Sequence, residues 1–220
     1  KFDELLFFQL QRLLAEKHAR LQPAPRIPFD KGTVQSFVHS LPFTLTSGQR
    51  RVAWDIIQDM TTQTPMYRLL EGDVGSGKTV VAAIAAANAL AAGHSVALMA
   101  PTEILARQHF LTLMDLFKHV AFPLALHTHA FHEHAFQKKP HGKSGRSLTG
   151  PRFTIGTHAL LEPSVDLGNL GLVIVDEQHR FGVEQRRAFQ QRSSEMTPHF
   201  LSLTATPIPR TLALAIAGDL

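Results

Sequence analysis

The sequence lacks cysteine entirely, which excludes disulfide bonds and thiolate metal sites among its 220 residues. This absence fits a reducing cytosol, and we expect a cytoplasmic protein. No apolar run reaches the roughly 18 uninterrupted residues of a membrane-spanning helix, and the sequence opens on Lys1 with no signal peptide. Charged residues make up only 18% against 44% apolar residues, which predicts a folded globular domain rather than a disordered chain.

The formal net charge is modest, at +4, and does not by itself identify a partner. A basic balance favours a polyanion such as nucleic acid, but an ordinary basic protein shows the same balance. The length is sufficient for one α/β domain with a sizeable buried core.

The most informative stretch is GDVGSGKT at residues 72–79, which fits the phosphate-binding loop pattern G-x-x-x-x-G-K-[ST]. An apolar run at 67–70 precedes it and an alanine- and valine-rich run at 80–92 follows, so that strand, glycine-rich turn and helix succeed one another. The glycines let backbone N–H groups approach phosphate oxygens, and the helix N-terminus adds partial positive charge. The residues predicted to bind the nucleotide are Gly72, Asp73, Val74, Gly75, Ser76, Gly77, Lys78 and Thr79.

Four residues are predicted to act on the phosphates, the Mg²⁺ ion or the attacking water. Lys78 supplies a full charge to the β- and γ-phosphates, and Thr79 offers a hydroxyl to Mg²⁺. Asp176 ends the apolar strand at 170–175 and is the second predicted Mg²⁺ ligand. Glu177 follows it and is placed to orient or deprotonate the water that attacks the γ-phosphate. Lys78, Asp176 and Glu177 are therefore the predicted catalytic residues.

A glutamine in the first turn of another helix is a candidate for reading the base. Thr46 or Ser47 can cap a helix over 48–60, which places Gln49 in its first turn. The amide of Gln49 both donates and accepts hydrogen bonds, as recognition of an adenine edge requires. The alternative is an ordinary surface glutamine.

Polar residues beyond Glu177 are candidates for coupling the nucleotide to another surface. Gln178 and His179 lie where a γ-phosphate sensor could reach Thr204 and Thr206 on an adjacent strand. The alternative is that His179 is a structural histidine and that the two threonines are turn and capping residues.

The order of predicted elements indicates the fold. Strands are expected at 67–70, 95–100, 122–126, 153–156, 170–175 and 200–203, and helices at 2–21, 48–60, 80–92, 104–118, 183–191 and from about 207 to 217. This alternation predicts an α/β fold, a doubly wound and mostly parallel sheet with ligands at the carboxyl ends of its strands. The amphipathic helix 2–21 is expected to be a connector, and the prolines after it end the helix.

Residues 127–151 change in character, with five histidines and several lysines among glycines and prolines. The composition predicts a loop. His-x-His spacing could hold a metal ion, but a basic loop that touches phosphates is favoured because the segment lacks a rigid frame.

The strings LTSGQ, GDVGSGKT, APTEILARQH, GTHAL, DEQHRFGVEQR and TATPIPRTLA occur in the order of the superfamily 2 helicase motifs. They span about residues 43–215, and the combination of HRFGV with TATPIPRTL resembles the RecG family of bacterial DNA helicases. The transcription-repair coupling factors are a related alternative, but Ser76 and Gln178 are more similar to the RecG pattern.

This resemblance implies a RecA-like motor lobe over 41–220, preceded by a connector helix and linker over 1–40. It also implies ATP and Mg²⁺ as cofactors, Gln49 as the adenine-reading residue, and branched DNA, such as forks and four-way junctions, as the partner. A second RecA-like lobe and a wedge domain are expected to belong to the same motor, outside this sequence. Motifs along the DNA backbone match Pro101, Thr102, Glu103, Gly156, Thr157 and His158, and the coupling motif matches Thr204, Ala205 and Thr206.

Two further interpretations stay open. The chain could be a nucleotide-binding switch without turnover, or a small-molecule kinase. The kinase interpretation leaves the DEQH and TATP strings unexplained.

Overall fold

The structure is a computed structural model that describes residues 23–120, 122–129, 132–135, 150–176, 188–189 and 196–205, the segment 132–135 by its backbone alone. The predicted helices at 2–21 and 207–217, and most of the one at 183–191, lie outside these residues.

Within the described residues, seven strands form a single sheet in the order β1-β7-β6-β2-β5-β3-β4. Every neighbouring pair is parallel except β3 and β4, which are antiparallel. The predicted mostly parallel α/β fold is therefore confirmed. The strands are β1 (Tyr67–Glu71), β2 (Ser95–Met99), β3 (Leu124–His127), β4 (His132–Ala135), β5 (Phe153–Gly156), β6 (Leu170–Asp176) and β7 (His199–Thr204).

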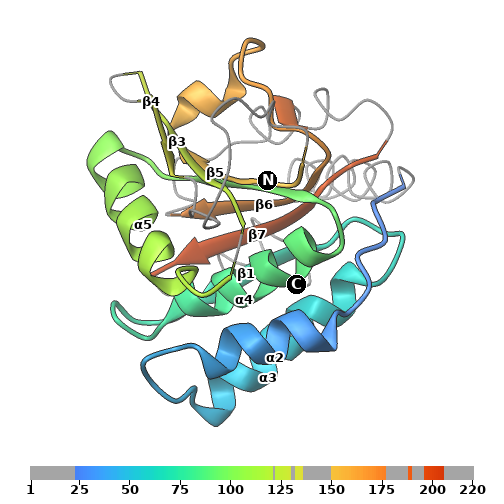
Figure 1. Cartoon of the computed structure of the whole chain (residues 1–220). Helices are drawn as coiled ribbons and strands as arrows, with labels where there is room; N and C mark the ends of the chain where they lie inside the picture. The colour runs from blue at the N-terminus through green and yellow to red at the C-terminus, as the bar shows by residue number, and fades with distance from the viewer. Residues whose placement is uncertain are drawn as a thin grey trace, which may run out of the picture.

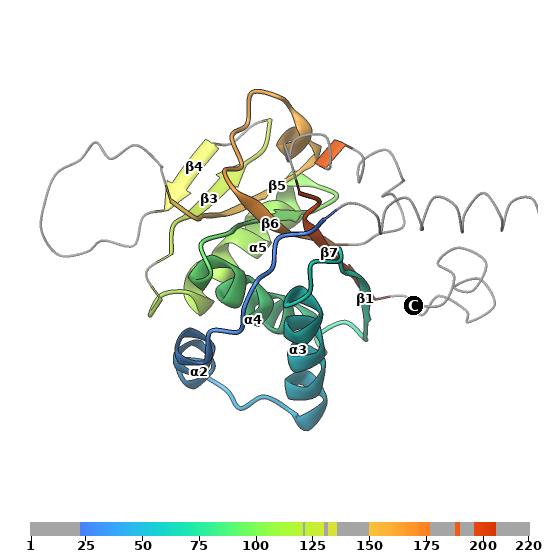
Figure 2. The ribbon, with the colours of Figure 1, turned by 90° about the vertical axis from the view of Figure 1, so that its right-hand side faces the viewer.

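Among the described residues, four α-helices lie on one side of the sheet. In both Figure 1 and Figure 2, α4 lies next to the sheet, and α2 and α3 lie on its outer side. No helix in the described part of the chain is long and apolar enough to cross a bilayer. The helices are α2 (Lys31–His39), α3 (Ser47–Met60), α4 (Lys78–Ala91) and α5 (Glu103–Leu116).

Successive side chains of each strand point to opposite faces of the sheet. One hydrophobic core therefore lies on each face. On β6, Leu172 and Ile174 face the helices, whereas Val173 and Val175 face the opposite side. A short 3₁₀ helix, η1 (His158–Leu161), and the chain after it cover that opposite face. The central strand is thus apolar on both faces, as its uninterrupted apolar sequence predicts.

Helix α4 is buried on all sides, with every residue from 80 to 90 inaccessible. A helix without a polar face must lie between other elements, and α4 lies between the sheet and the pair α2 and α3. The helix that follows the glycine-rich turn is therefore held firmly in place.

The segment before α3 is more ordered than the sequence predicts. Asp30 caps α2 by accepting the Thr33 N–H at 2.6 Å, and Val34 and Phe37 pack into the helix-side core. Residues 23–30 run as an extended strap beside α4, from the vicinity of β7 to α2 (Figure 2). The strap and α2 thus pack on the same core as the residues that follow, and the domain boundary at residue 40 stays a prediction.

The prediction of a loop over 127–151 is wrong at its beginning. His127 completes β3, and residues 132–135 form β4, with His127 opposite His132 and Leu124 opposite Ala135. β4 is an edge strand, where polar residues are tolerated and even useful. Its sequence, HEHA, therefore carries no apolar signal that would mark a strand.

Candidate nucleotide-binding and nucleic-acid site

The ends of three neighbouring strands bring the predicted nucleotide residues to one edge of the sheet. Glu71 at the end of β1 pairs with Thr204 on β7, and Leu203 pairs with Asp176 on β6. The Gly72 N–H also donates to the Thr204 carbonyl oxygen at 3.3 Å. The phosphate-binding loop, Thr204 and Asp176 therefore share the carboxyl edge of the sheet, where parallel sheets bind ligands.

The loop itself adopts a backbone that two of its glycines make possible. Gly75 and Gly77 have φ angles of 81° and 85°, in the left-handed region that side chains disfavour. A Cβ on Gly77 would also collide with the side-chain amide of Gln49. The turn closes through a 3.1 Å hydrogen bond from the Ser76 N–H to the Asp73 carbonyl oxygen. The glycine at 77 is thus favoured by its backbone conformation, and a side chain there would displace the Gln49 amide.

The N-terminus of α4 is suited to bind an anion. The side chains of Asp30, Thr46 and Thr102 accept hydrogen bonds at the starts of α2, α3 and α5. At the start of α4 the capping residue is Gly77, which offers no side chain. The Val80 N–H donates to the Gly77 carbonyl oxygen at 3.1 Å, whereas Lys78 and Thr79 come too early in α4 for their N–H groups to find an acceptor one turn back. These two donors and the helix dipole fit a phosphate group.

The lysine of the loop lies against the loop backbone. Lys78 Nζ donates to the carbonyl oxygens of Gly72 at 2.6 Å and Asp73 at 2.9 Å. The exposed loop residues 73–76 therefore surround a full positive charge. This arrangement fits the β- and γ-phosphates of a nucleotide.

The predicted Mg²⁺ ligands are oxygen donors, which Mg²⁺ prefers. Thr79 is half-buried in the first turn of α4, and Asp176 lies at the end of β6. In the described part of the chain, no group of three or more His, Cys, Asp or Glu side chains could cage a metal ion. The hydroxyl of Thr79 and the carboxylate of Asp176 thus fit an ion that also takes phosphate oxygens of a nucleotide as ligands.

Gln49 braces the loop from helix α3. Its Nε2 donates to the Ser76 carbonyl oxygen at 2.9 Å, and its Oε1 accepts the Thr46 N–H at 2.9 Å. Thr46 Oγ1 in turn accepts the Gln49 N–H at 3.1 Å, which completes a capping box. The Gln49 amide still has one N–H and one lone pair that these contacts do not use. Recognition of adenine by Gln49 stays a prediction, whereas its contact with the loop is observed.

A histidine that the sequence analysis did not single out contacts the predicted metal ligand. His109 Nε2 lies 2.6 Å from Asp176 Oδ2, and the two side chains are only 13% and 17% exposed. His109 lies on the inner face of α5, between Ala106 and Leu113, which are both buried. A polar residue within that apolar face is the signal that could have indicated it.

The segments predicted to follow DNA leave the next two strands of the sheet. Met99 pairs with Gly156 where β2 and β5 end, and the Ala100 N–H donates to the Gly156 carbonyl oxygen at 2.8 Å. Residues 101–103 and 156–158 consequently start side by side. Thr102 and His158 are exposed, Pro101 and Glu103 are half-buried, and Gly156 and Thr157 are buried.

The buried members of this set shape the turn rather than face solvent. A Cβ on Gly156 would collide with the His127 carbonyl oxygen and with the side chain of Leu160. Thr157 Oγ1 accepts the Ala159 N–H at 3.5 Å at the start of η1. Of the three residues at this turn, His158 is therefore the one whose side chain is exposed to a partner.

Several predicted site residues lie outside the described part of the chain. These are Glu177, Gln178, His179 and Thr206. Ala205 is described and half-buried directly after β7.

The family model for DEAD/DEAH box helicases matches residues 46–215. The chain is 43% identical over 222 residues to the ATP-dependent DNA helicase RecG of Aquifex aeolicus, covering 100% of this chain and 27% of that protein. Its identity to the Synechocystis sp. RecG is 44% over 220 residues, covering 100% of this chain and 26% of that protein. The chain thus spans about a quarter of the length of these relatives.

Among solved structures, RecG bound to a three-way DNA junction matches with a TM-score of 0.78 and 36% identity. The match covers 99% of this chain and 28% of that chain. Fold, motif geometry and sequence agree. The chain therefore belongs to the DEAD/DEAH box helicase family, and it is similar to RecG along the whole of its own length.

Proposed function

We propose that this chain is the ATP-binding motor lobe of a RecG-like DNA helicase that acts on branched DNA. The observation that carries the proposal is the arrangement of the sheet edge. The loop after β1, Thr204 at the end of β7 and Asp176 on β6 lie beside the segments that leave β2 and β5. This arrangement supports a nucleotide site and a nucleic-acid surface on adjacent strands.

In this mechanism the loop binds the phosphates of ATP. Lys78 exchanges its two backbone carbonyl partners for phosphate oxygens, and the uncapped N–H groups of α4 donate to the same groups. Gln49 holds the loop in shape through its hydrogen bond to the loop backbone. It recognises the adenine edge with the N–H and the lone pair of its amide that are still available.

Thr79 and Asp176 would hold Mg²⁺, which when bound neutralises phosphate charge during transfer. Glu177 orients or deprotonates the attacking water. The pairing of β7 with both β1 and β6 lets Thr204, Ala205 and Thr206 respond to the nucleotide, together with Gln178 and His179.

The DNA partner is proposed from the exposed side chains of Thr102 and His158 and from the similar structure of RecG bound to a three-way DNA junction. A second motor lobe and a wedge domain complete the proposed motor, because the matched relatives are three to four times longer than the matched segment. A cytoplasmic location stays a prediction.

The proposal is tested by binding of a fluorescent ATP analogue to the wild-type chain and to Lys78→Ala. Loss of the ammonium should abolish binding, whereas Lys118→Ala, which removes an exposed ion pair with Asp115, should not change it. Unchanged affinity of the Lys78 variant would refute the loop assignment. In the full-length protein, Glu177→Gln should keep ATP binding and lose hydrolysis, and normal turnover would remove Glu177 from the mechanism.

A further inference from the structure

One side-chain contact joins the two halves of the site. β6, which ends in Asp176, and β2, which leads into the first segment proposed to follow DNA, are neighbours in the sheet, so the two halves of the site meet between these strands. Asp176 belongs to β6, and α5 follows β2. The hydrogen bond between His109 and Asp176 spans that seam, at 2.6 Å.

The direction of this hydrogen bond follows from the chemistry of the partners. An ionised aspartate only accepts hydrogen bonds, so His109 Nε2–H donates to Asp176 Oδ2. This contact fixes the rotation of the carboxylate and leaves Oδ1 as the oxygen for a metal or its bound water. Both side chains are largely buried, so bulk water competes weakly for the contact.

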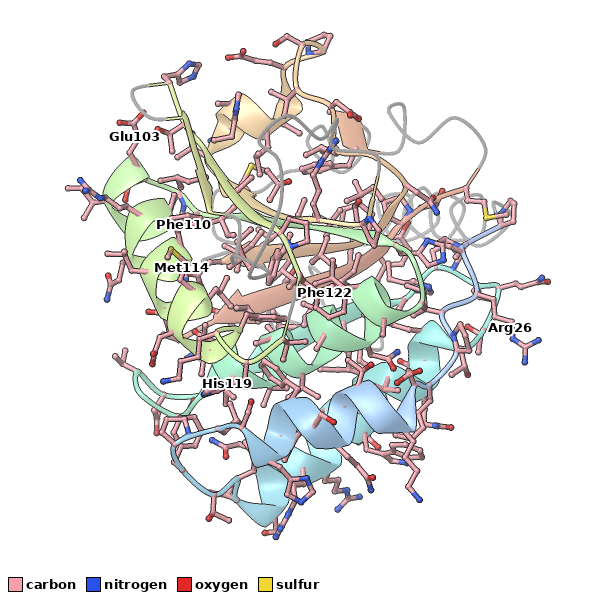
Figure 3. The ribbon with its side chains drawn as sticks, viewed as in Figure 1. Arg26, Glu103, Phe110, Met114, His119 and Phe122 are labelled. Carbon is pink, nitrogen blue, oxygen red and sulfur yellow. The ribbon has the colours of Figure 1, made fainter. Side chains whose placement is uncertain are left out.

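Helix α5 also links this contact to the exposed start of the helix. Thr102 caps α5 by accepting the Leu105 N–H at 3.3 Å, and Phe110 and Leu113 anchor the helix in the core. Figure 3 shows Glu103 and His119 at opposite ends of this helix. A displacement at its start therefore reaches His109 through a rigid element two turns long.

We propose that His109 is a positioning residue, which holds the Asp176 carboxylate in the orientation for Mg²⁺ and couples α5 to the metal site. The proposal rests on the proposed function, because it assumes that Asp176 serves a nucleotide-bound Mg²⁺. Residues that orient a metal ligand commonly contribute a factor of about 10–100 in metal affinity or activity.

Two amide substitutions of nearly equal chemistry test the donor. The amide nitrogen of His109→Gln can occupy the place of Nε2, whereas that of His109→Asn reaches only to the place of Nδ1. His119→Asn is the matched control, because His119 is exposed beyond the end of α5. The readout is the affinity for mant-ADP with Mg²⁺ divided by its affinity with EDTA.

We expect this ratio to fall by about tenfold or more in His109→Asn, and to stay close to wild type in His109→Gln and His119→Asn. A wild-type ratio in His109→Asn would overturn the proposal, and so would an equal fall in both His109 variants, since that would indicate ring packing. Each ratio compares a variant with itself, so a general loss of stability does not mimic the effect.

The coupling is tested in the full-length protein by the stimulation of ATP hydrolysis with a three-way DNA junction. His109→Asn should lower the stimulation and His109→Gln should retain it. If Lys78→Ala abolishes mant-ADP binding while His109→Asn behaves as wild type, the inference fails and the proposed function stands. If Lys78→Ala still binds, the proposed function itself fails.

Discussion

The backbone N–H of Gly72 donates a 3.3 Å hydrogen bond to the carbonyl oxygen of Thr204, which joins the first residue of the phosphate-binding loop to the end of β7. Because this contact is made by backbone atoms, it survives a change of the Thr204 side chain. The side chain is itself buried, at 1% exposure. Loop shape and side-chain signalling at Thr204 can therefore be separated by mutation.

Thr204→Val replaces the hydroxyl by a methyl group of similar volume. We expect nucleotide affinity to stay close to wild type, because the backbone contact with Gly72 remains. DNA stimulation of ATP hydrolysis should fall by about tenfold, in the range of coupling energies measured between sites. Parallel binding and hydrolysis assays check this, and a loss of affinity without a loss of stimulation would contradict it.

Gly77→Ala has a matched control elsewhere in the chain. Gly77 and Gly93 share nearly the same backbone angle, with φ of 85° and 87°, but a Cβ on Gly93 meets open space. Both alanines should cost stability, about 1–2 kcal/mol, from the left-handed backbone. Only Gly77→Ala should also displace Gln49 and lose nucleotide binding. Urea unfolding and nucleotide titration measure the two effects, and binding by Gly77→Ala equal to that of Gly93→Ala would contradict the loop geometry.

Gln49→Ala separates the observed brace from the proposed reading of adenine. It removes the contact with the Ser76 carbonyl oxygen and half of the capping box with Thr46, which should destabilise the chain by about 1 kcal/mol. If Gln49 also reads adenine, the variant loses its preference for ATP over GTP. If affinities for both nucleotides fall equally, the residue acts only as a brace.

The parts of this molecule that could be predicted are those whose local sequence is compatible with only one kind of structure. GDVGSGKT between an apolar run and an alanine-rich run dictates strand, loop and helix, and β6 is apolar on both faces because helices and loops cover both. These elements and their order agree with the prediction to within a few residues.

The elements that sequence reasoning missed depend on tertiary contacts. Helix α2 buries only Val34 and Phe37, and β4 has a polar sequence that an edge position permits. The hydrogen bond between His109 and Asp176 joins residues that are 67 positions apart in the sequence. Such a contact follows from strand order, which local pattern does not specify.

His199 makes stability depend on pH. The ring is fully buried, with Nδ1 accepting the Met66 N–H at 3.1 Å and Nε2 donating to the Pro25 carbonyl oxygen at 2.8 Å. Burial lowers the pKa of His199 below its usual 6.5, against the opposing effect of the Pro25 hydrogen bond; nearby His94 lowers it further and Asp59 raises it. The neutral ring therefore holds the strap at residue 25 to the start of the sheet.

Because the folded pKa is depressed, the unfolded chain binds more protons once the pH falls below 6.5. The free energy of unfolding should decrease below that pH, with a slope of at most about 1.4 kcal/mol per pH unit for this group. His199→Asn should reduce the slope, and His119→Asn should leave it unchanged. Urea unfolding midpoints measured at several pH values below 6.5 give this slope. An unaltered slope in His199→Asn would show that another group causes the pH dependence.

We propose that nucleotide turnover by this lobe is coupled to branched DNA. The most direct measurement is the rate of ATP hydrolysis by the full-length protein with a three-way DNA junction, with a linear duplex of equal length, and without DNA. We expect strong stimulation by the junction, weaker stimulation by the duplex, and loss of all turnover in Lys78→Ala. Full activity without DNA, or equal activity in all three conditions, would contradict it.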